Sequence, residues 1–339
     1  MTSHPYSRPR RLRSSSAIRS MVKENQIHPS DFIVPLFFME GKNKKVEIPS
    51  MPGYFRFTTD LLIDEVRECQ ALGLQSVLLF AKVEDSLKDK NGSEALNPDG
   101  LMQRAIKEIK KNFPDMYVIS DVALDPYSSS GHDGIVEEGE ILNDLSVEVL
   151  AEMALSHAQA GVDMVAPSDM MDGRIGYIRE VLEENAFPNV GILSYAVKYA
   201  SCFYGPFRDA LDSAPGFGDK KTYQMDPSNA QEALRECELD VQEGADLLMV
   251  KPGMLYLDVL QLVNQNFDIP VAAYQVSGEY AMIHAAAEKG WIDLDLAMME
   301  SIIAFKRAGA TLIASYFAKD IARKLSASSA QNVANKKAL

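Results

Sequence analysis

The sequence predicts an α/β fold of the (β/α)8 barrel type with an extended N-terminal arm, and two observations indicate it. An amphipathic stretch repeatedly ends at a small turn residue and leads into a short apolar run, as at Gly73, Gly161, Gly244 and Gly309. Such a glycine is typical of a helix C-cap, and the apolar run is typical of a strand buried on both faces. The second observation is that strands and helices alternate along most of the chain, as in a parallel barrel.

The predicted elements follow one another in a regular order. Strands are expected near residues 31–38, 76–82, 116–124, 164–168, 190–197, 247–251, 270–276 and 311–316. Helices are expected near residues 60–72, 98–113, 146–160, 174–185, 227–243, 254–266, 278–289 and 294–308. Eight strands alternating with eight helices form a closed barrel. A doubly wound open sheet is the alternative, but its first strand normally leads into a glycine-rich phosphate loop, and here MEGK (39–42) follows instead.

The two ends of the chain differ from the barrel, which is expected to span residues 30–325. Residues 1–29 form a basic segment, with five arginines and no acid in the first twenty positions. This start is either an organelle transit signal or an arm that contacts an acidic neighbouring subunit. Residues 326–339 are small and polar and are expected to fray.

Composition excludes several classes of protein. A hydrophobic content of 47% over 339 residues supports a large core, and a net charge of −14 argues against a nucleic-acid partner. No apolar run is long enough to span a bilayer, so no membrane partner is expected. Cys69, Cys202 and Cys237 have no spacing typical of a metal site or a disulfide, which suits a reducing cytosol. The sequence therefore predicts a cytoplasmic protein.

Two lysines stand at the ends of predicted strands. Lys251 follows LLMV (247–250), and Lys198 follows VGILSYAV (190–197). The carboxyl ends of barrel strands form the mouth where barrel enzymes carry out their chemistry. Burial and a neighbouring cation both lower the pKa of a lysine, which makes it a nucleophile for ketones. Either the lysines act in this way, or each one only extends to solvent. Other polar residues at these strand ends are Lys82, Asp121, Ser168, Asp169, Ser277 and Tyr316.

Four segments carry a resemblance to a known family. They read MVAPSDMMDGR (164–174), SCFYGPFRDA (201–210), LMVKPG (248–253) and YQVSGEY (274–280). Through them the chain, from Arg8 to about Leu325, resembles the porphobilinogen synthases, also called 5-aminolaevulinate dehydratases. The resemblance implies a (β/α)8 barrel with an N-terminal arm, assembled into a homo-oligomer that is expected to be an octamer. It also implies a lyase of tetrapyrrole biosynthesis that condenses two 5-aminolaevulinate molecules into porphobilinogen, with loss of water, through lysine Schiff bases.

The resemblance also implies roles for individual residues. Lys251 matches the lysine that forms a Schiff base with the propionate-side substrate, and Lys198 matches the lysine that serves the acetate-side substrate. Asp121 matches an acid of the catalytic pocket, which either polarises a substrate nitrogen or only caps a strand. Segment 204–224 is either a lid over the site or an ordinary surface loop. The expected substrate-binding residues are Ser277 and Tyr316 for one carboxylate, Arg208, Lys220 and Gln224 for the other, and Tyr204 and Phe207.

Metal chemistry is where the chain departs from the zinc-dependent members. They carry three cysteines where this chain has Ala123, Asp125 and Asp133, so a three-cysteine zinc site is excluded. Carboxylates suit Mg²⁺, so the chain resembles the Asp-rich, magnesium-responsive subgroup. Glu236 matches a glutamate that holds a hydrated, allosteric Mg²⁺, and Asp240 lies one turn further as a second-shell residue. The alternative is a solvated acidic helix face. A monovalent cation is a further candidate cofactor.

Two rival functions are open on the sequence alone. A class I aldolase on the same fold needs only one imine-forming lysine, so a pair of lysines argues against it. A non-catalytic barrel that binds an anionic ligand would use both lysines as point charges. Borohydride distinguishes these cases, because it reduces an imine to a stable adduct and leaves an ion pair unchanged.

Overall fold

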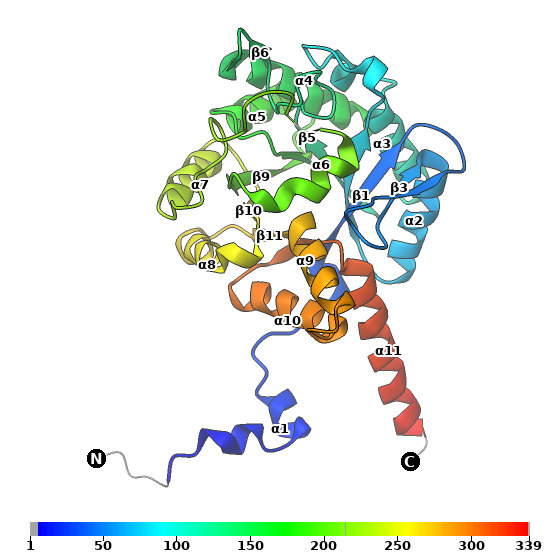
Figure 1. Ribbon diagram of the computed structural model, residues 1–339, viewed down its shortest axis with the longest axis vertical. Helices are drawn as coiled ribbons and strands as arrows, with labels where there is room; N and C mark the ends of the chain where they lie inside the picture. Colours follow the sequence, from blue (N-terminus) through cyan, green and yellow to red (C-terminus); the bar gives the residue numbers. More distant parts are fainter. Residues whose placement is uncertain (1–5, 214, 338–339) are drawn as a thin grey trace.

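A closed barrel of eight parallel strands forms the body of the chain (Figure 1). The computed structural model describes residues 6–213 and 215–337, with side chains as far as residue 327. Strand β12 pairs with β1 and so closes the barrel. In chain order the barrel strands are β1 (Phe32–Met39), β4 (Ser76–Lys82), β5 (Tyr117–Val122), β8 (Met164–Pro167), β9 (Gly191–Lys198), β10 (Leu247–Lys251), β11 (Val271–Gln275) and β12 (Leu312–Ser315).

Helices surround the barrel and confirm the predicted alternation (Figure 1). They are α2 (Thr59–Ala71), α3 (Leu101–Asn112), α4 (Asn143–Ala160), α5 (Arg174–Glu184), α7 (Glu232–Gln242), α8 (Leu257–Asn266), α9 (Ser277–Glu288) and α10 (Leu294–Arg307). Among the described residues, no helix has the length and apolar character needed to cross a bilayer.

Several short elements were not predicted. They are β2 (Lys45–Glu47), β3 (Phe55–Thr58), β6 (Val136–Glu137), β7 (Glu140–Ile141) and α6 (Gly205–Leu211). The antiparallel pair of β2 and β3 extends the barrel sheet beside β1. Helix α6 lies across the carboxyl end of the barrel and is the element that matters for the site (Figure 1).

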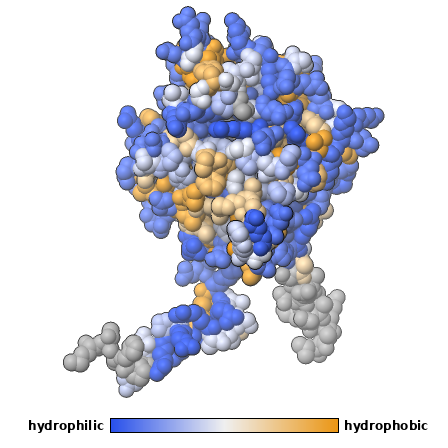
Figure 2. Space-filling view, in the orientation of Figure 1, coloured by the Kyte–Doolittle hydropathy of each residue, from blue (hydrophilic) through white to orange (hydrophobic). Residues whose placement is uncertain are grey.

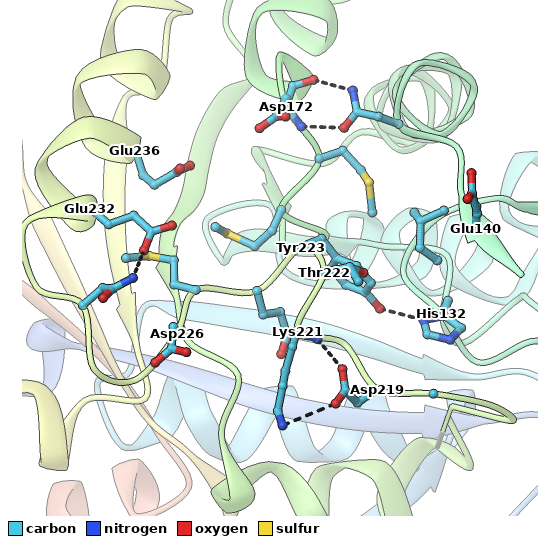
Figure 3. Close-up of a pocket in the computed structure, with 18 of the residues that line it drawn as sticks. His132, Glu140, Asp172, Asp219, Lys221, Thr222, Tyr223, Asp226, Glu232 and Glu236 are labelled. Carbon is cyan, nitrogen blue, oxygen red and sulfur yellow. Dashed lines mark hydrogen bonds and ion pairs between the residues drawn. The ribbon is translucent and has the colours of Figure 1, made fainter.

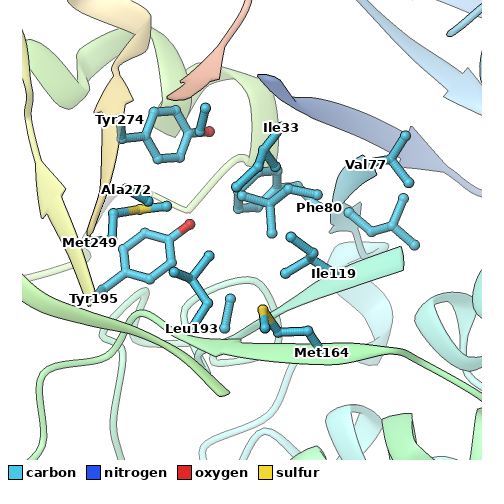
Figure 4. Close-up of a cluster of buried hydrophobic side chains, with 14 of the residues drawn as sticks. Ile33, Val77, Phe80, Ile119, Met164, Leu193, Tyr195, Met249, Ala272 and Tyr274 are labelled. Carbon is cyan, nitrogen blue, oxygen red and sulfur yellow. The ribbon is translucent and has the colours of Figure 1, made fainter. Parts of the chain in front are cut away.

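Apolar side chains fill the inside of the barrel (Figure 4). Ile33, Ile119, Leu193 and Met249 come from four different strands and are all buried. Because successive residues of a strand point to opposite sides, every barrel strand must be apolar on both its inner and its outer face. The barrel is therefore packed rather than hollow, and chemistry is confined to its ends.

The ends of the chain extend away from the barrel (Figure 1). A 3-10 helix (Pro9–Arg13) and α1 (Ser16–Met21) form the described part of the arm, and neither contains a buried residue. Figure 2 shows this arm as largely hydrophilic, yet Leu12 and Met21 are exposed on it. Residues 1–5 lie outside the described residues.

The C-terminal tail differs from the prediction that residues 326–339 fray. Helix α11 (Ala318–Lys337) continues through most of this tail, and residues 338–339 lie outside the described part. The helix contains neither glycine nor proline and is rich in alanine and lysine, which have high helix propensity. A composition of small and polar residues therefore does not exclude a helix in this part of the chain.

Candidate active site

The two strand-end lysines lie side by side at the carboxyl end of the barrel. Lys251 of β10 is in register with Lys198 of β9, so the pairing of the two strands places them opposite each other. A cavity of about 30 Å³ lies between them. It is lined by Asp121, Asp125, Asp133, Ser168, Lys198, Tyr204, Phe207, Arg208, Lys220, Gln224 and Lys251. The structure therefore brings together all the predicted catalytic and substrate-binding residues except Ser277 and Tyr316.

Lys251 is a buried amine surrounded by aromatic rings. Its Nζ lies 4.7 Å from the ring centroid of Tyr274 and 4.9 Å from that of Phe207. This amine makes no hydrogen bond or ion pair to another described residue. Burial, followed by the positive charge of Lys198, lowers the pKa of Lys251 to about 7. A large fraction of Lys251 is therefore a neutral, nucleophilic amine near neutral pH.

Lys198 is buried as well, but it has partners. Its Nζ donates a hydrogen bond to the carbonyl oxygen of Ser168 and lies 3.4 Å from Oδ2 of Asp133. The neighbouring amines are thus in different states, because one is held by polar groups and the other faces aromatic rings. This asymmetry suits one lysine that reacts readily and one that reacts after its partners are displaced.

Three aspartates surround the lysines. Burial favours a neutral Asp133, but Lys198 and Lys220 outweigh it and lower the pKa of this carboxyl. Burial, followed by the negative charge of Asp125, raises the pKa of Asp121 to about 7. Burial also raises the pKa of Asp125, against the attraction of Lys220. Asp121 can therefore exchange a proton at neutral pH, which is the property of a general acid–base.

A folded segment covers the cavity, and we call residues 202–213 and 215–224 the lid segment. It contains α6 and supplies Tyr204, Phe207, Arg208, Lys220 and Gln224 to the cavity. The Tyr204 hydroxyl donates a hydrogen bond to the carbonyl oxygen of Lys251 at 3.1 Å. The Nζ of Lys220 lies 2.8 Å from Oδ1 of Asp133. These contacts make the segment a part of the site rather than a loose surface loop.

The cavity beneath the lid segment is too small for a substrate. Its volume of about 30 Å³ is well below the roughly 300–1,000 Å³ that is typical of small-molecule pockets. The Nζ of Lys82 lies 2.7 Å from Oδ2 of Asp212, so this predicted strand-end lysine also contacts the lid segment. Entry of a substrate requires the lid segment to move.

Ser277 and Tyr316 do not line the cavity. The Tyr316 hydroxyl is 3.1 Å from the hydroxyl of Tyr274, whose ring contacts the Lys251 amine. Ser277 stands at the start of α9, and its Oγ is buried without a hydrogen-bond partner among the described residues. The expected contact of these two residues with a substrate carboxylate therefore stays a prediction.

The family model for Delta-aminolevulinic acid dehydratase matches residues 6–324. The chain belongs to the delta-aminolevulinic acid dehydratase family. The enzyme of Bacillus subtilis is 52% identical over 323 residues, which cover 95% of this chain and 99% of that one. The chloroplastic enzyme of Physcomitrium patens is 54% identical over 322 residues, which cover 94% of this chain and 74% of that one.

A solved structure of the same family resembles the whole barrel. It is the Toxoplasma gondii delta-aminolevulinic acid dehydratase, also named porphobilinogen synthase, in complex with the reaction product porphobilinogen. It matches with a TM-score of 0.92 and 53% sequence identity, and it covers 94% of this chain and 91% of that chain. The predicted (β/α)8 barrel is therefore confirmed, and it is the fold of a solved member of the family.

Two pocket residues were known from the sequence only as replacements of cysteine. Asp125 and Asp133 each lie near Lys220, and Asp133 also pairs with Lys198. They follow β5 in a loop of no regular periodicity, so no local pattern indicates which cations they contact. In this dehydratase they serve as counter-charges for lysines.

The candidate magnesium residue faces a different and larger cleft. Glu236 lines a cleft of about 960 Å³ together with Glu232 and Asp172 (Figure 3). Glu236 makes no hydrogen bond or ion pair to another described residue, and burial raises its pKa. The described residues contain no cluster of three or more His, Cys, Asp or Glu that could hold a metal. The donor set fits an ion that keeps most of its water, as Mg²⁺ does.

Asp240 does not face this cleft. It is buried, and its Oδ2 lies 3.2 Å from a guanidinium nitrogen of Arg174 and also accepts from Ser194. Arg174 in turn lies 3.8 Å from Asp169. Asp240 therefore does not line the cleft that Glu236 faces, and its role as a second-shell residue of a metal site stays a prediction.

Proposed function

We propose that the barrel mouth performs the reaction of the delta-aminolevulinic acid dehydratase family in this chain, with Lys251 as the principal Schiff-base residue. The enzyme condenses two 5-aminolaevulinate molecules into porphobilinogen with loss of water, in tetrapyrrole biosynthesis. The observation that carries the assignment is the pair of lysines in register, of which Lys251 has a lowered pKa and no polar partner. These are the conditions under which a lysine attacks a ketone.

The residues around the lysines support a two-substrate mechanism. The Lys251 amine adds to the ketone of the first substrate, water leaves, and a protonated imine results. This imine withdraws electrons, so the adjacent carbon loses a proton more readily. Lys198 anchors the second ketone in the same way, which turns the encounter of two substrates into a reaction between bound groups. Asp121 lies in the same cavity with a raised pKa and supplies or accepts protons during these steps.

Lys220, Arg208 and Gln224 provide the proposed clamp for the second substrate's carboxylate. In the closed cavity Lys220 is paired with Asp133 and Asp125. A substrate carboxylate would replace these aspartates as the partner of Lys220, and Arg208 would supply a second cation from the same lid segment. Exchange of the aspartates for the substrate carboxylate would keep the lid segment closed over the second substrate. Ser277 and Tyr316 remain the candidates for the first carboxylate.

We also propose that Mg²⁺ acts through Glu236, away from the chemistry. The proposal is supported by a half-buried carboxylate that faces a cleft shared with Glu232 and Asp172 and has no protein cation within hydrogen-bond reach. Lys221 and Tyr223 of the lid segment line the same cleft, so an ion there would bear on lid closure. A hydrated ion needs few protein ligands, which agrees with this donor set.

Assembly and location are parts of the same proposal. An arm with exposed Leu12 and Met21 and clustered arginines suits contact with a second copy of the chain, and an octamer is the proposed assembly. A cytoplasmic location is proposed by analogy with the Bacillus subtilis relative. Plant relatives are named chloroplastic, so a transit role for the arginine-rich start is the alternative.

The activity is tested directly by mixing the purified full chain with 5-aminolaevulinate and following pyrrole formation. Porphobilinogen is expected to accumulate at a rate proportional to the concentration of enzyme. Absence of pyrrole from folded protein, with and without added Mg²⁺, would contradict the proposed function.

A further inference from the structure

His132 lies beneath the lid segment and contacts it at two points. It is buried, with 2% of its surface exposed, in the loop between β5 and β6. Its Nε2 lies 3.1 Å from the carbonyl oxygen of Phe217. Its Nδ1 lies 3.0 Å from the hydroxyl of Tyr223 (Figure 3). Lys220 lies midway between these two lid residues in the sequence, so one imidazole holds both sides of the stretch that carries it.

One of the two contacts fixes the role of its ring nitrogen. A carbonyl oxygen can only accept, so Nε2 carries the hydrogen and donates it to Phe217. Nδ1 shares a hydrogen bond with the Tyr223 hydroxyl. The oxygen of that hydroxyl in turn accepts the backbone N–H of Asp133 at 3.4 Å. Both ring nitrogens and the tyrosine hydroxyl therefore have hydrogen-bond partners.

Packing and a backbone bond support the same attachment. The ring of Phe217 packs against the imidazole with centroids 4.6 Å apart. The backbone N–H of Gly216 donates to the carbonyl oxygen of Ser130 at 2.9 Å. The loop after β5 thus contacts the lid segment on both sides of Lys220, and the next residue of that loop, Asp133, pairs with Lys220 itself at 2.8 Å.

We infer that His132 is a positioning residue that fixes residues 217–223 of the lid segment in the closed arrangement, so that Lys220 and Gln224 face the second-substrate pocket. His132 does not line the catalytic cavity, so it acts through the lid segment rather than on the substrate. The inference rests on the proposed function and adds to it a residue whose role is lid closure. Its loss should impair the second substrate more than the first, because Lys251 is anchored on β10 and not by His132.

The first test compares His132→Ala with the wild-type enzyme. Loss of two ordinary hydrogen bonds should raise the KM for 5-aminolaevulinate, by roughly two- to tenfold for each bond. Trapping of an imine at Lys251 by borohydride should remain at the wild-type level. Trypsin should cleave after Lys220 or Lys221 several-fold faster, because the lid segment opens more often. His284→Ala removes a histidine outside the lid segment and should leave both readouts unchanged.

The second test separates the two hydrogen bonds. His132→Gln places an amide donor near the position of Nε2, whereas His132→Asn places an amide oxygen near the position of Nδ1. Tyr223→Phe should therefore raise KM in the wild-type and His132→Asn backgrounds. In the His132→Gln background it should cause a smaller increase, because the bond between His132 and Tyr223 is already absent and only the contact with the Asp133 N–H is lost.

Three results would overturn the inference that His132 positions the lid segment. Wild-type KM together with wild-type cleavage of the lid segment in His132→Ala would overturn it. So would a fall in kcat with unchanged KM, or an equal effect of Tyr223→Phe in all backgrounds. If no variant forms pyrrole or an imine, the proposed function fails, while the rate of tryptic cleavage still decides whether His132 holds the lid segment.

Discussion

Lys251 and Lys198 lie opposite each other on neighbouring strands, yet only Lys198 is held by polar partners. The free Lys251 has a pKa of about 7, lowered first by burial and then by the charge of Lys198. The second lysine therefore has two roles, since it anchors one substrate and helps to keep its neighbour neutral.

The first prediction concerns the dependence of the Lys251 pKa on the charge of Lys198. Imine formation needs the neutral amine, so the rate of borohydride-trapped adduct at Lys251 should rise with pH through about 7 and then level off. Lys198→Met removes the neighbouring positive charge, so the pKa of Lys251 should rise and the profile should move to higher pH. Porphobilinogen formation should be almost lost in the same variant. Lys82→Met, at another strand end, is the control and should leave the pH profile in place.

The second prediction concerns the carboxylate clamp. Arg208→Ala and Lys220→Ala should each raise the KM for 5-aminolaevulinate, because a charge-assisted hydrogen bond contributes about 1.5–3 kcal/mol. Lys221→Ala removes an exposed lysine next to Lys220 and is the matched control. Steady-state kinetics of pyrrole formation measure the effect. Equal KM values for all three variants would show that the lid segment does not bind a carboxylate.

The third prediction concerns the metal. Activity should depend on Mg²⁺ rather than Zn²⁺, and Glu236→Ala should make the enzyme indifferent to Mg²⁺. Glu238→Ala, on an exposed position of the same helix, should keep the full response. Titration of Mg²⁺ into chelator-treated enzyme measures the response, and sedimentation follows the oligomer. The account of the site fails if a zinc-selective chelator abolishes activity that Mg²⁺ cannot restore.

Strand ends were the part of the site that the sequence could locate. A charged residue directly after a buried apolar run cannot lie in the packed interior, so it lies at the end of the strand. Lys251, Lys198 and Asp121 were therefore placed correctly at one mouth of the barrel. The barrel strands and their helices were predictable for the same reason, since their periodicity is set by burial. The prediction for α11 differed because polar composition alone does not exclude a helix.

Contacts between distant segments were not predictable. The pairing of Lys220 with Asp133 joins residues from the lid segment and the loop after β5, and no local pattern links them. The orientation of Asp240 was also missed. Helical spacing places it on the side of Glu236, but the buried Arg174 attracts its carboxylate inward, and this arginine could not be recognised as buried from the sequence.

The most direct test of the account is to locate the imine. The full-length enzyme is incubated with 5-aminolaevulinate, reduced with borohydride, digested and analysed by mass spectrometry. The added mass is predicted on the peptide that contains Lys251, and it should disappear from that peptide in Lys251→Met together with pyrrole formation. An adduct that forms only on other peptides, or a Lys251→Met enzyme with near wild-type turnover, would contradict the central claim.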